Sequence, residues 1–415
     1  MRYAVVTFGC RVNQADSLEV EAALAIAGAT AVAADAADLV VVNTCSVTAS
    51  ADQGARQTIR RIHRQNPSAR IIVTGCFATR AVDAVAGLPG VAAVVPNSSK
   101  PGLGRALLAL VAPGSQGPCG RPPSPGLMGR TAWTLRAQTG CEEACSYCII
   151  PSTRGPSASR SAVEVLDELR RVVDAGYKEV VLTGVHLGAW GRDLGRPQAL
   201  ADLLGLVAGE PGRFRVRVSS LEPMDCTPSV LDVLCGSPER FAPHLHLPLQ
   251  HSEDDLLVAM RRPYSGRDYL TLVQDVRRRL PDAAIGTDVI VGFPGESDRQ
   301  AEALAEFLAS SPVTHAHVFP YSDREGTDAS AYGGKVHGAA VKARAARIRA
   351  VSGALTAKFR ASQAGLVRQA LTIDDGRTCV TDNYIRVSLP PGHARNAWVD
   401  VVVPPLAGAP SPDAD

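Results

Sequence analysis

Gly140-Cys-Glu-Glu-Ala-Cys-Ser-Tyr-Cys148 is the stretch that decides both the architecture and the chemistry of this chain. It carries Cys141, Cys145 and Cys148 in a C-x3-C-x2-C spacing. Three thiolates can bind three irons of a cubane, and the fourth iron, which lacks a protein ligand, can then bind a small chelating substrate. Four-cysteine patterns close every iron, and a structural zinc site needs a fourth ligand that the nearby sequence lacks. The motif therefore predicts an open iron–sulfur cluster.

Length and composition bound the class of protein. The 415 residues are too many for one compact core and predict two or three domains. The net charge is only +2, so a nucleic-acid surface requires local clusters of basic residues. The start, MRYAVVTFGC, lacks the pattern of a secretory signal, and no apolar run is long enough to cross a bilayer. We therefore expect a cytoplasmic protein that does not enter a membrane, whose ten cysteines indicate metal or catalysis rather than disulfides.

The chain divides into segments of different pattern. Residues 1–111 alternate strands and helices and predict an α/β domain with a parallel sheet. A linker rich in proline and glycine, 112–129, follows it. The expected strands are Tyr3–Phe8, Leu39–Val42 and Ile71–Val73, and the expected helices are 15–28, 49–65 and 79–88.

The alternation resumes over residues 130–364 and predicts a partial (β/α)6 barrel that ends in a long basic helix, 338–364. Ligands of such barrels lie at the carboxyl ends of the strands, and Cys141 follows the first strand. Residues 365–404 contain short β segments and turns, which predict a small β-barrel-like domain, and 405–415 resembles a disordered tail. The expected barrel strands are 133–137, 179–182, 214–218, 244–247, 284–291 and 314–318.

A second set of thiols lies in the N-terminal domain. Cys10, Cys45 and Cys76 each follow a predicted strand by two or three residues. Because parallel strands end at the same sheet edge, the three positions converge if the strands are neighbours. Gly9 and Gly75 let the backbone turn tightly beside a bulky ligand. We favour a second metal site with an open position, against the alternatives of zinc or three small apolar side chains that cap the sheet.

With both sets placed, the chain resembles the methylthiotransferases of the radical S-adenosylmethionine superfamily. The resemblance extends over nearly the whole chain and implies a radical S-adenosylmethionine barrel, followed by a C-terminal RNA-binding β-barrel, the TRAM domain. Thr381–Val387 resembles the core of that domain. It is carried by Thr7–Gln14, Val42–Thr48, Val73–Cys76, Gly140–Pro151, Arg217–Pro223, His246–Gln250 and Thr287–Glu296.

The resemblance implies two 4Fe–4S clusters, one on Cys141, Cys145 and Cys148 and one on Cys10, Cys45 and Cys76. It also implies that the first cluster cleaves S-adenosylmethionine to a 5′-deoxyadenosyl radical, which abstracts a hydrogen from C2 of adenine. The second cluster then carries or donates the sulfur, and another S-adenosylmethionine supplies the methyl group. Such chemistry must come from cofactors, since C2–H is beyond the reach of acid–base catalysis by side chains. An electron donor such as flavodoxin or ferredoxin is implied as a partner.

Further residues are candidates for binding S-adenosylmethionine: Thr183, Gly184, Glu222, Gly292 and Gly295. They lie at strand ends, where glycines are also ordinary turn formers. The same location makes Gln250 a candidate for contact with cofactor or base. His186 either contacts the modified base or is a rim histidine with one hydrogen bond, and we favour the second interpretation. His244 with His246, and His315 with His317, alternate on single strands and are interpreted as packing residues. No role is assigned to Cys119, Cys226, Cys235 or Cys379.

The acceptor is indicated by Leu182–Gly191 and by Ala51-Asp52 with Arg56–Arg61, which resemble the branch that acts on N6-threonylcarbamoyladenosine 37 of tRNA. The alternatives are isopentenyladenosine 37 of tRNA, a ribosomal protein and, in a different class, a non-catalytic RNA-binding protein stabilised by metal. A target adenine must be unstacked, which suits an anticodon loop. Two basic clusters could contact that RNA, namely Arg56, Arg60, Arg61 and Arg64, and Lys342, Arg344, Arg347, Arg349, Lys358, Arg360 and Arg368.

Three departures from the family pattern stand out. His251-Ser252 replaces the usual Ser-Gly, so a close backbone approach to ligand is altered. Phe77 replaces a common Tyr and removes a hydroxyl near the second set of thiols. The TRAM-like tail is short, which predicts a weaker grip on RNA.

Overall fold

The structure is a computed structural model that describes residues 1–415 except 105, 108–123, 127–129, 197–198 and 406–415. Most of the expected linker, with Cys119, and nearly all of the expected tail lie outside the described residues. In the described part of the chain, no helix combines the length and the apolar character needed to cross a membrane.

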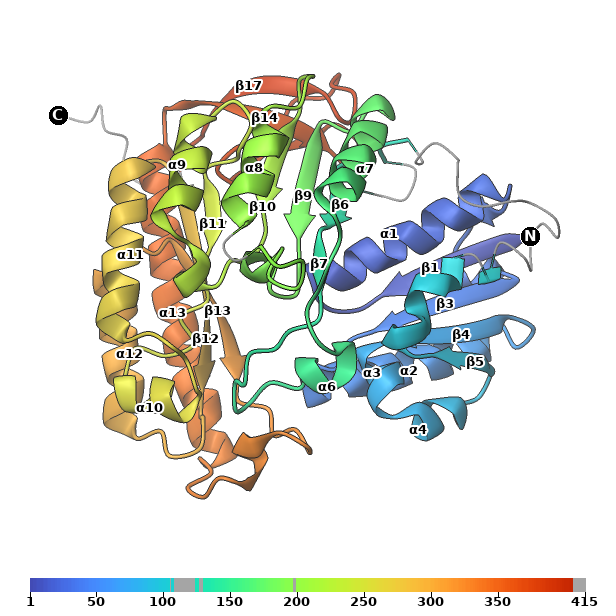
Figure 1. Cartoon of the computed structure of the whole chain (residues 1–415), viewed down its shortest axis with the longest axis horizontal. Coiled ribbons are helices and arrows are strands. Elements are labelled where there is room, and N and C mark those ends of the chain that lie inside the picture. Colours follow the sequence, from blue (N-terminus) through green and yellow to red (C-terminus); the bar gives the residue numbers. More distant parts are fainter. Residues whose placement is uncertain (105, 108–123, 127–129, 197–198, 406–415) are drawn as a thin grey trace.

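The N-terminal sheet has five parallel strands in the order β2-β1-β3-β4-β5, with helices on its faces (Figure 1). The central strand β3 is buried along its whole length, as expected for a strand covered on both sides. All three strands predicted in this region are present. The strands are β1 (Arg2–Thr7), β2 (Thr30–Ala31), β3 (Leu39–Thr44), β4 (Arg70–Gly75) and β5 (Val91–Val95), and the helices are α1 (Arg11–Ile26), α2 (Ala49–Gln65), α3 (Cys76–Arg80) and α4 (Val82–Ala86).

Two helices here differ from the prediction. α1 begins at Arg11, earlier than expected, because the polar residue Asn13 of its first turn is buried by hydrogen bonds to the Phe8 and Thr44 carbonyls. The helix expected at 79–88 is divided at Ala81, whose φ of −134° is not helical.

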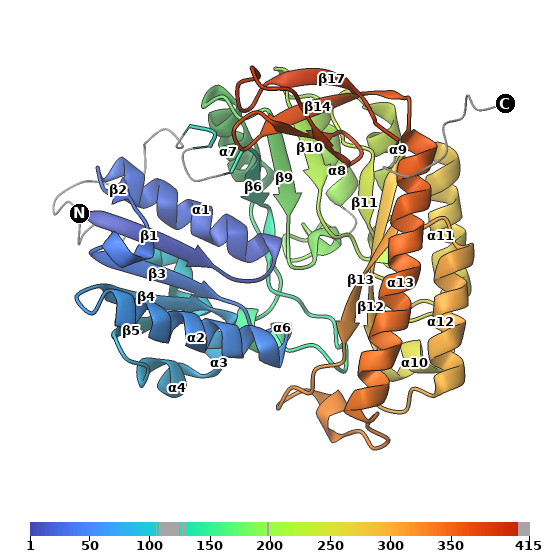
Figure 2. The ribbon, with the colours of Figure 1, turned by 180° about the vertical axis from the view of Figure 1, so that it is seen from behind.

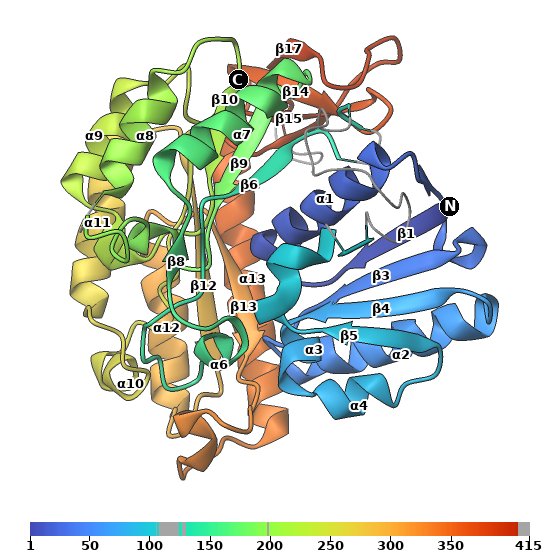
Figure 3. The ribbon, with the colours of Figure 1, turned by 45° about the vertical axis from the view of Figure 1, so that its right-hand side comes forward.

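The predicted (β/α) barrel is present as two three-stranded parallel sheets that adjoin, β6-β9-β10 and β11-β12-β13. The isolated bridge between Val216 and Phe241 and the bond from the Leu221 N–H to the His246 carbonyl (2.9 Å) connect them. The arc is open between β6 and β13, and the N-terminal domain lies on that side (Figure 3). The strands are β6 (Trp133–Arg136), β9 (Glu179–Thr183), β10 (Arg215–Val218), β11 (His244–His246), β12 (Ala284–Val291) and β13 (His315–Pro320).

Helices cover the outer face of the arc, and the largest hydrophobic core lies between them and the strands. Leu203, Val289, Leu304 and Ile348 are completely buried there. The long helix expected at 338–364 is α13, which packs along β13 (Figure 2). The helices are α6 (Ile150–Arg154), α7 (Ala162–Asp174), α8 (Leu200–Ala208), α9 (Pro228–Gly236), α10 (Asp254–Ala259), α11 (Gly266–Arg279), α12 (Asp298–Ser310) and α13 (Gly338–Gln363), and a short ribbon pairs β7 (Gln138–Thr139) with β8 (Ala158–Ser159).

The C-terminal segment is a four-stranded antiparallel sheet in the order β16-β15-β14-β17. It covers the amino-terminal ends of the barrel strands (Figure 1). Arg217 on β10 donates to the Asp382 carbonyl (3.0 Å), and Arg215 donates to the Gln369 side chain (2.7 Å). The strands are β14 (Val367–Ile373), β15 (Thr378–Thr381), β16 (Arg386–Ser388) and β17 (Trp398–Val402).

Candidate active site

The cysteines of the N-terminal domain meet at one sheet edge. Cys10 caps α1, Cys45 follows β3 directly and Cys76 begins α3, and the strands before them, β1, β3 and β4, are neighbours. A Cβ on Gly9, whose φ is +88°, would lie 2.5 Å from the Cys45 sulfur, so only glycine allows this approach. Burial raises the pKa of the Cys45 thiol, a hydrogen bond from the Val47 N–H lowers it, and the nearby Cys10 and Cys76 raise it, so that the pKa is about 11. A bound metal would stabilise the thiolate form of Cys45.

The other three cysteines lie on the rim of the barrel, in the loop that follows β6 and β7. The Cys141 N–H donates to the Gly155 carbonyl (3.1 Å), and the Cys148 N–H donates to the Cys145 carbonyl (3.1 Å). Gly140 has a φ of +73°, and a Cβ on it would collide with the Pro156 carbonyl. Burial raises the pKa of Cys148 to about 12 and that of Cys145 above its usual value. The loop is therefore fixed by its backbone and presents half-buried thiols.

One side chain links the two sets of cysteines. The Asn97 amide donates to the Thr153 carbonyl (2.9 Å) and contacts the Cys76 sulfur at 3.7 Å. Thr153 belongs to α6, which begins two residues after Cys148. The carboxyl edge of the N-terminal sheet and the rim of the barrel thus face each other, with α6 between them (Figure 3).

The spacing of the thiols bears on the metal they fit. In the described chain, neither set brings its three sulfur atoms within 4.8 Å of one another. The sulfurs of a tetrahedral zinc site lie only about 3.8 Å apart, given a Zn–S bond of about 2.3 Å.

Glu222 follows β10 and forms an ion pair with Arg262. Arg262 also donates to the Cys145 sulfur (3.2 Å) and to the Tyr264 hydroxyl (3.0 Å). A buried guanidinium therefore stands beside a proposed cluster ligand and a carboxylate at a strand end. No sequence signal identifies Arg262, because it lies 117 residues beyond Cys145 and belongs to no recognisable motif.

The other predicted cofactor residues lie at strand ends. Thr183 is buried at the end of β9 and accepts a bond from the Ser219 hydroxyl (3.0 Å). A Cβ on Gly184 would lie 2.9 Å from the Leu187 backbone, so this glycine allows the next loop to pack closely.

Gly292 and Gly295 have φ values of +77° and +88°, which favour glycine. The side-chain position of Gly292 faces Val341 of α13, so this glycine makes room for a helix, whereas that of Gly295 opens on free space. The role of both in cofactor binding stays a prediction.

The His186 ring contacts three side chains, whereas the sequence favours a single hydrogen bond. One of them is Glu143, whose Oε1 lies 3.7 Å from Nδ1. Its Nε2 lies 2.6 Å from Asp225 Oδ2, and its Nδ1 lies 3.8 Å from the Cys141 sulfur. Burial lowers the pKa of His186, but the bonds to Asp225 and Cys141 outweigh it and raise the pKa to about 10. The loop Val185–Trp190, used to infer the acceptor, therefore reaches the rim cysteines directly.

Two of the family departures have structural counterparts. His251 is fully buried and its Nε2 lies 3.4 Å from Glu296. Phe77 is fully buried, and the Arg56 guanidinium lies 4.6 Å from its ring centre. Of the cysteines without an assigned role, Cys226 and Cys379 are buried and Cys235 is half-buried.

The basic clusters differ in how free their charges are. On α13 and β14, Arg344 pairs with Glu296 and Asp298, Arg347 with Glu302, and Arg368 with Asp282 and Asp382. The guanidinium groups of these arginines are therefore less available to bind RNA phosphates than the sequence suggests. On α2, in contrast, Arg60, Arg61 and Arg64 are exposed, and within the described residues they form no salt bridge.

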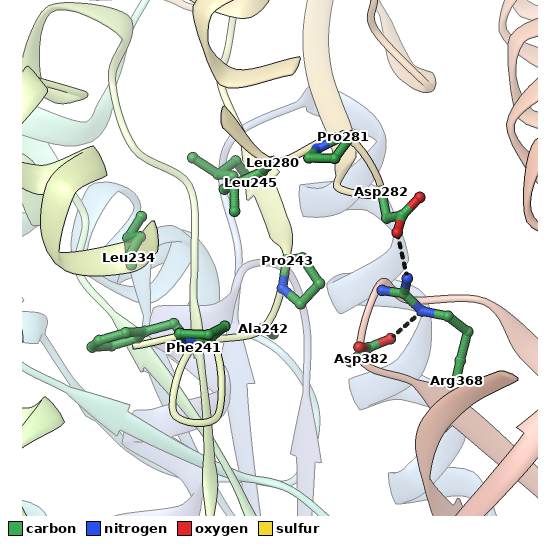
Figure 4. A pocket seen from close by; sticks show the side chains of 11 residues that line it. Leu234, Phe241, Ala242, Pro243, Leu245, Leu280, Pro281, Asp282, Arg368 and Asp382 are labelled. Atoms are coloured by element: carbon green, nitrogen blue, oxygen red, sulfur yellow. Dashed lines mark hydrogen bonds and ion pairs between the residues drawn. The ribbon is translucent and has the colours of Figure 1, made fainter. Parts of the chain in front are cut away.

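A cavity of about 230 Å³ lies away from this rim, between the amino-terminal side of β11 and the C-terminal sheet (Figure 4). Its walls are mostly apolar, with Leu234, Phe241 and Leu245 among them. At one side Arg368 connects Asp282 and Asp382 (Figure 4). This cavity is separate from the cysteines.

Comparisons with known proteins agree with this arrangement. The model of the Uncharacterized protein family UPF0004 matches residues 2–96, and that of the Radical SAM superfamily matches residues 135–308. In solved structures, the radical S-adenosylmethionine methyltransferase TsrM of Kitasatospora setae is similar, with a TM-score of 0.56 at 16% identity over 77% of this chain and 72% of that one. This likeness shows a shared fold.

Closer similarity is found to three kinds of curated protein. The threonylcarbamoyladenosine tRNA methylthiotransferase MtaB of Bacillus subtilis is 33% identical over 85% of this chain and 82% of its own length. The ribosomal protein uS12 methylthiotransferase RimO of Acidothermus cellulolyticus is 30% identical over 92% and 87%. The tRNA-2-methylthio-N(6)-dimethylallyladenosine synthase of Paenarthrobacter aurescens is 34% identical over 90% and 75%. With two sets of three cysteines on this fold and relatives of this identity along most of its length, the chain belongs to the methylthiotransferase family of the radical S-adenosylmethionine superfamily.

Proposed function

We propose that this protein converts N6-threonylcarbamoyladenosine 37 of tRNA into its 2-methylthio derivative. Several relatives named for that activity are 32–36% identical to it over at least 80% of this chain. The loop Val185–Trp190, which resembles this branch, contacts the rim cysteines through His186. A tRNA substrate would place the reaction in the cytoplasm.

The observation that carries the proposal is the arrangement of the cysteines. Asn97 joins Cys76 to the segment that follows Cys148, so the two sets face one another across the domain interface. Radical formation and sulfur donation must act on the same carbon, and this arrangement allows one bound base to reach both. An electron-transfer protein would have no need of two open sites that face each other.

In this proposal each set of cysteines binds one 4Fe–4S cluster: Cys141, Cys145 and Cys148 the first, and Cys10, Cys45 and Cys76 the second. When bound, these clusters and S-adenosylmethionine supply the radical, the sulfur and the methyl group. The residues of the chain would position these groups and balance their charge. Arg262 places a positive charge beside Cys145, and the burial of Thr183 limits access of water to the end of β9.

The RNA would approach from the N-terminal side, where the exposed arginines of α2 offer positive charge to phosphates. An anticodon loop is a suitable target because its bases are easily unstacked. The C-terminal sheet is proposed to be the TRAM domain and to hold the tRNA body. A small reductant such as flavodoxin or ferredoxin would supply electrons.

Nucleoside mass spectrometry of a deletion strain tests the proposal. The 2-methylthio-threonylcarbamoyl nucleoside should be lost on deletion, restored by the wild-type gene and not restored by Cys141→Ala. The half-buried Cys235 offers a matched control, and Cys235→Ala should restore it. Persistence of the nucleoside in the deletion strain would refute the substrate.

The relatives that act on dimethylallyladenosine or on uS12 have comparable identity, so identity alone does not decide the acceptor. The same mass spectra report the isopentenyl nucleosides, and peptide mass spectrometry reports a modified ribosomal protein. About eight irons per anaerobically reconstituted chain are expected from two clusters. Zinc without iron or sulfide would instead favour the non-catalytic RNA-binding alternative.

A further inference from the structure

One wall of the barrel carries a row of imidazoles that the proposed chemistry does not use. β11, β12 and β13 are neighbouring parallel strands (Figure 2), and in their register His246 pairs with Gly286 and Asp288 pairs with His317. Side chains of a strand alternate between its two faces. Leu245 and Val289 point to the helices and belong to the hydrophobic core. The histidines and Asp288 therefore lie on the inner face of the barrel.

Three of these side chains converge on one point. His246 Nε2 lies 2.8 Å from Asp288 Oδ1, and His317 Nδ1 lies 3.2 Å from the same oxygen. Among the described histidines, cysteines and acids, this is the one group whose three ligand atoms all lie within 4.8 Å of one another. Ligands about 2.0–2.2 Å from a common ion lie roughly 3 Å apart, so the observed spacing needs little adjustment to accept one.

A glycine creates the space for this arrangement. A Cβ on Gly286 would lie 2.5 Å from His315 Nε2 and 2.8 Å from His246 Nδ1. Any other residue at this position would push the two rings apart. His315 is thereby held close to the group, with its ring centre 5.5 Å from that of His317.

Charge and access are also suitable for a cation. Asp288 places a carboxylate between the two imidazoles. His246 is buried, Asp288 is half-buried and His317 is exposed. The group therefore has a rigid inner side and a side through which an ion can enter.

We propose that His246, Asp288 and His317 bind one divalent first-row transition metal ion, at a site separate from both sets of cysteines. Two imidazoles and one carboxylate suit zinc, cobalt or ferrous iron better than magnesium or calcium, which prefer oxygen ligands alone. Three protein ligands leave further coordination positions open. The competing explanation is a His–Asp–His hydrogen-bonded group that binds no ion.

Cobalt(II) is the probe that separates these explanations. Cobalt(II) is added to the reconstituted holoenzyme, whose cysteines are occupied by iron. Unbound cobalt is then removed by gel filtration. Elemental analysis gives cobalt per chain, and low-temperature EPR gives its ligand field, since oxidised 4Fe–4S clusters are diamagnetic. Wild type should retain about one cobalt per chain, with the spectrum of a nitrogen and oxygen environment.

Variants make the test specific. Asp288→Asn and His317→Ala should each bind cobalt at least tenfold more weakly, whereas His393→Ala, which removes an exposed histidine of the C-terminal segment, should match wild type. Because His317 is exposed, its replacement should leave folding and iron content unchanged, and both are measured. Cobalt retained equally by all variants, or not retained by wild type, would overturn the site. Neither result depends on tRNA or on the identity of the acceptor.

Discussion

The carboxylate of Asp16 on α1 holds the N-terminal domain against the barrel. Its side chain is only 1% exposed and lies 2.7 Å from Lys100 Nζ and 3.0 Å from Arg154 Nη2, and it also pairs with Arg136. Asp16→Asn keeps the shape and removes the charge. Arg136 retains Glu19 at 3.1 Å, but Lys100 and Arg154 lose their carboxylate partner inside the interface. The variant should therefore loosen the contact between the two sets of cysteines.

The structure sets the size of the effect. Burial raises the pKa of Asp16, but Lys100, Arg154 and Arg136 outweigh it and lower the pKa to about 2. At 1.36 kcal/mol per pKa unit, that lowering is worth roughly 2.5 kcal/mol, and breaking a buried ion pair costs about 3–5 kcal/mol. This stabilisation is complete above the unfolded pKa of about 3.9 and is lost only as the pH falls toward 2. At neutral pH the variant should thus lose about 3 kcal/mol.

Hydrogen exchange followed by mass spectrometry measures this loss locally, which avoids assuming two-state unfolding of several domains. Amides of α1 and α6 that exchange through separation of the domains should exchange about 100-fold faster in Asp16→Asn, as about 3 kcal/mol requires. Asp167→Asn is the control, because Asp167 pairs with Arg170 on an exposed helix face and should cost at most about 1 kcal/mol. Equal exchange of the α1 amides in the two variants would show that Asp16 does not hold the two domains together.

Three further predictions follow from the site and its surroundings. Asn97→Ala should lower the yield of methylthiolated product at least tenfold while 5′-deoxyadenosine still forms, because the contact with Cys76 is lost but the rim cysteines are intact. Chromatography with mass spectrometry measures both products. A parallel loss of both products would contradict this prediction. Arg262→Met should reduce 5′-deoxyadenosine formation more than tenfold at unchanged iron content, since the charge beside Cys145 is removed; full activity would exclude that role. Arg60→Ala should weaken binding to an anticodon stem-loop and reduce the log–log salt slope by about 1, whereas an unchanged slope would show that α2 does not touch RNA.

The local parts of this fold were predictable from sequence. Short β-branched runs such as Leu39–Val42 form strands because their side chains pack on both faces of a covered sheet. Once the strands are parallel neighbours, the residues after them must share an edge, which is why Cys10, Cys45 and Cys76 converge. The rim position of Cys141 follows from the same rule.

The non-local parts were not predictable. Asn97, Arg262 and Asp16 act on partners 21 to 138 residues away, and no periodicity or short motif records such pairs. The early start of α1 has the same origin, because the polar residue Asn13, ahead of the expected helix, is buried by a hydrogen bond to the Thr44 carbonyl, 31 residues away. The contact of His246 and His317 with Asp288 was not predictable for the same reason. The alternation of side chains along a strand assigns each histidine to one face, but only the register between the strands brings both to Asp288.

The buried pair of His251 and Glu296 explains why Arg344, a basic residue that the sequence suggests is available to RNA, is instead bound within the fold. The Glu253 N–H donates to His251 Nδ1 (3.1 Å), so the ring proton is on Nε2 and faces the fully buried Glu296. Glu296 also accepts from the Gly292 N–H and from Arg344 Nη1 (2.7 Å). An ionised Glu296 needs these donors, since a buried charge without partners is costly. Arg344 therefore anchors α13 to the turn after β12, and its charge is committed to the fold before any RNA approaches.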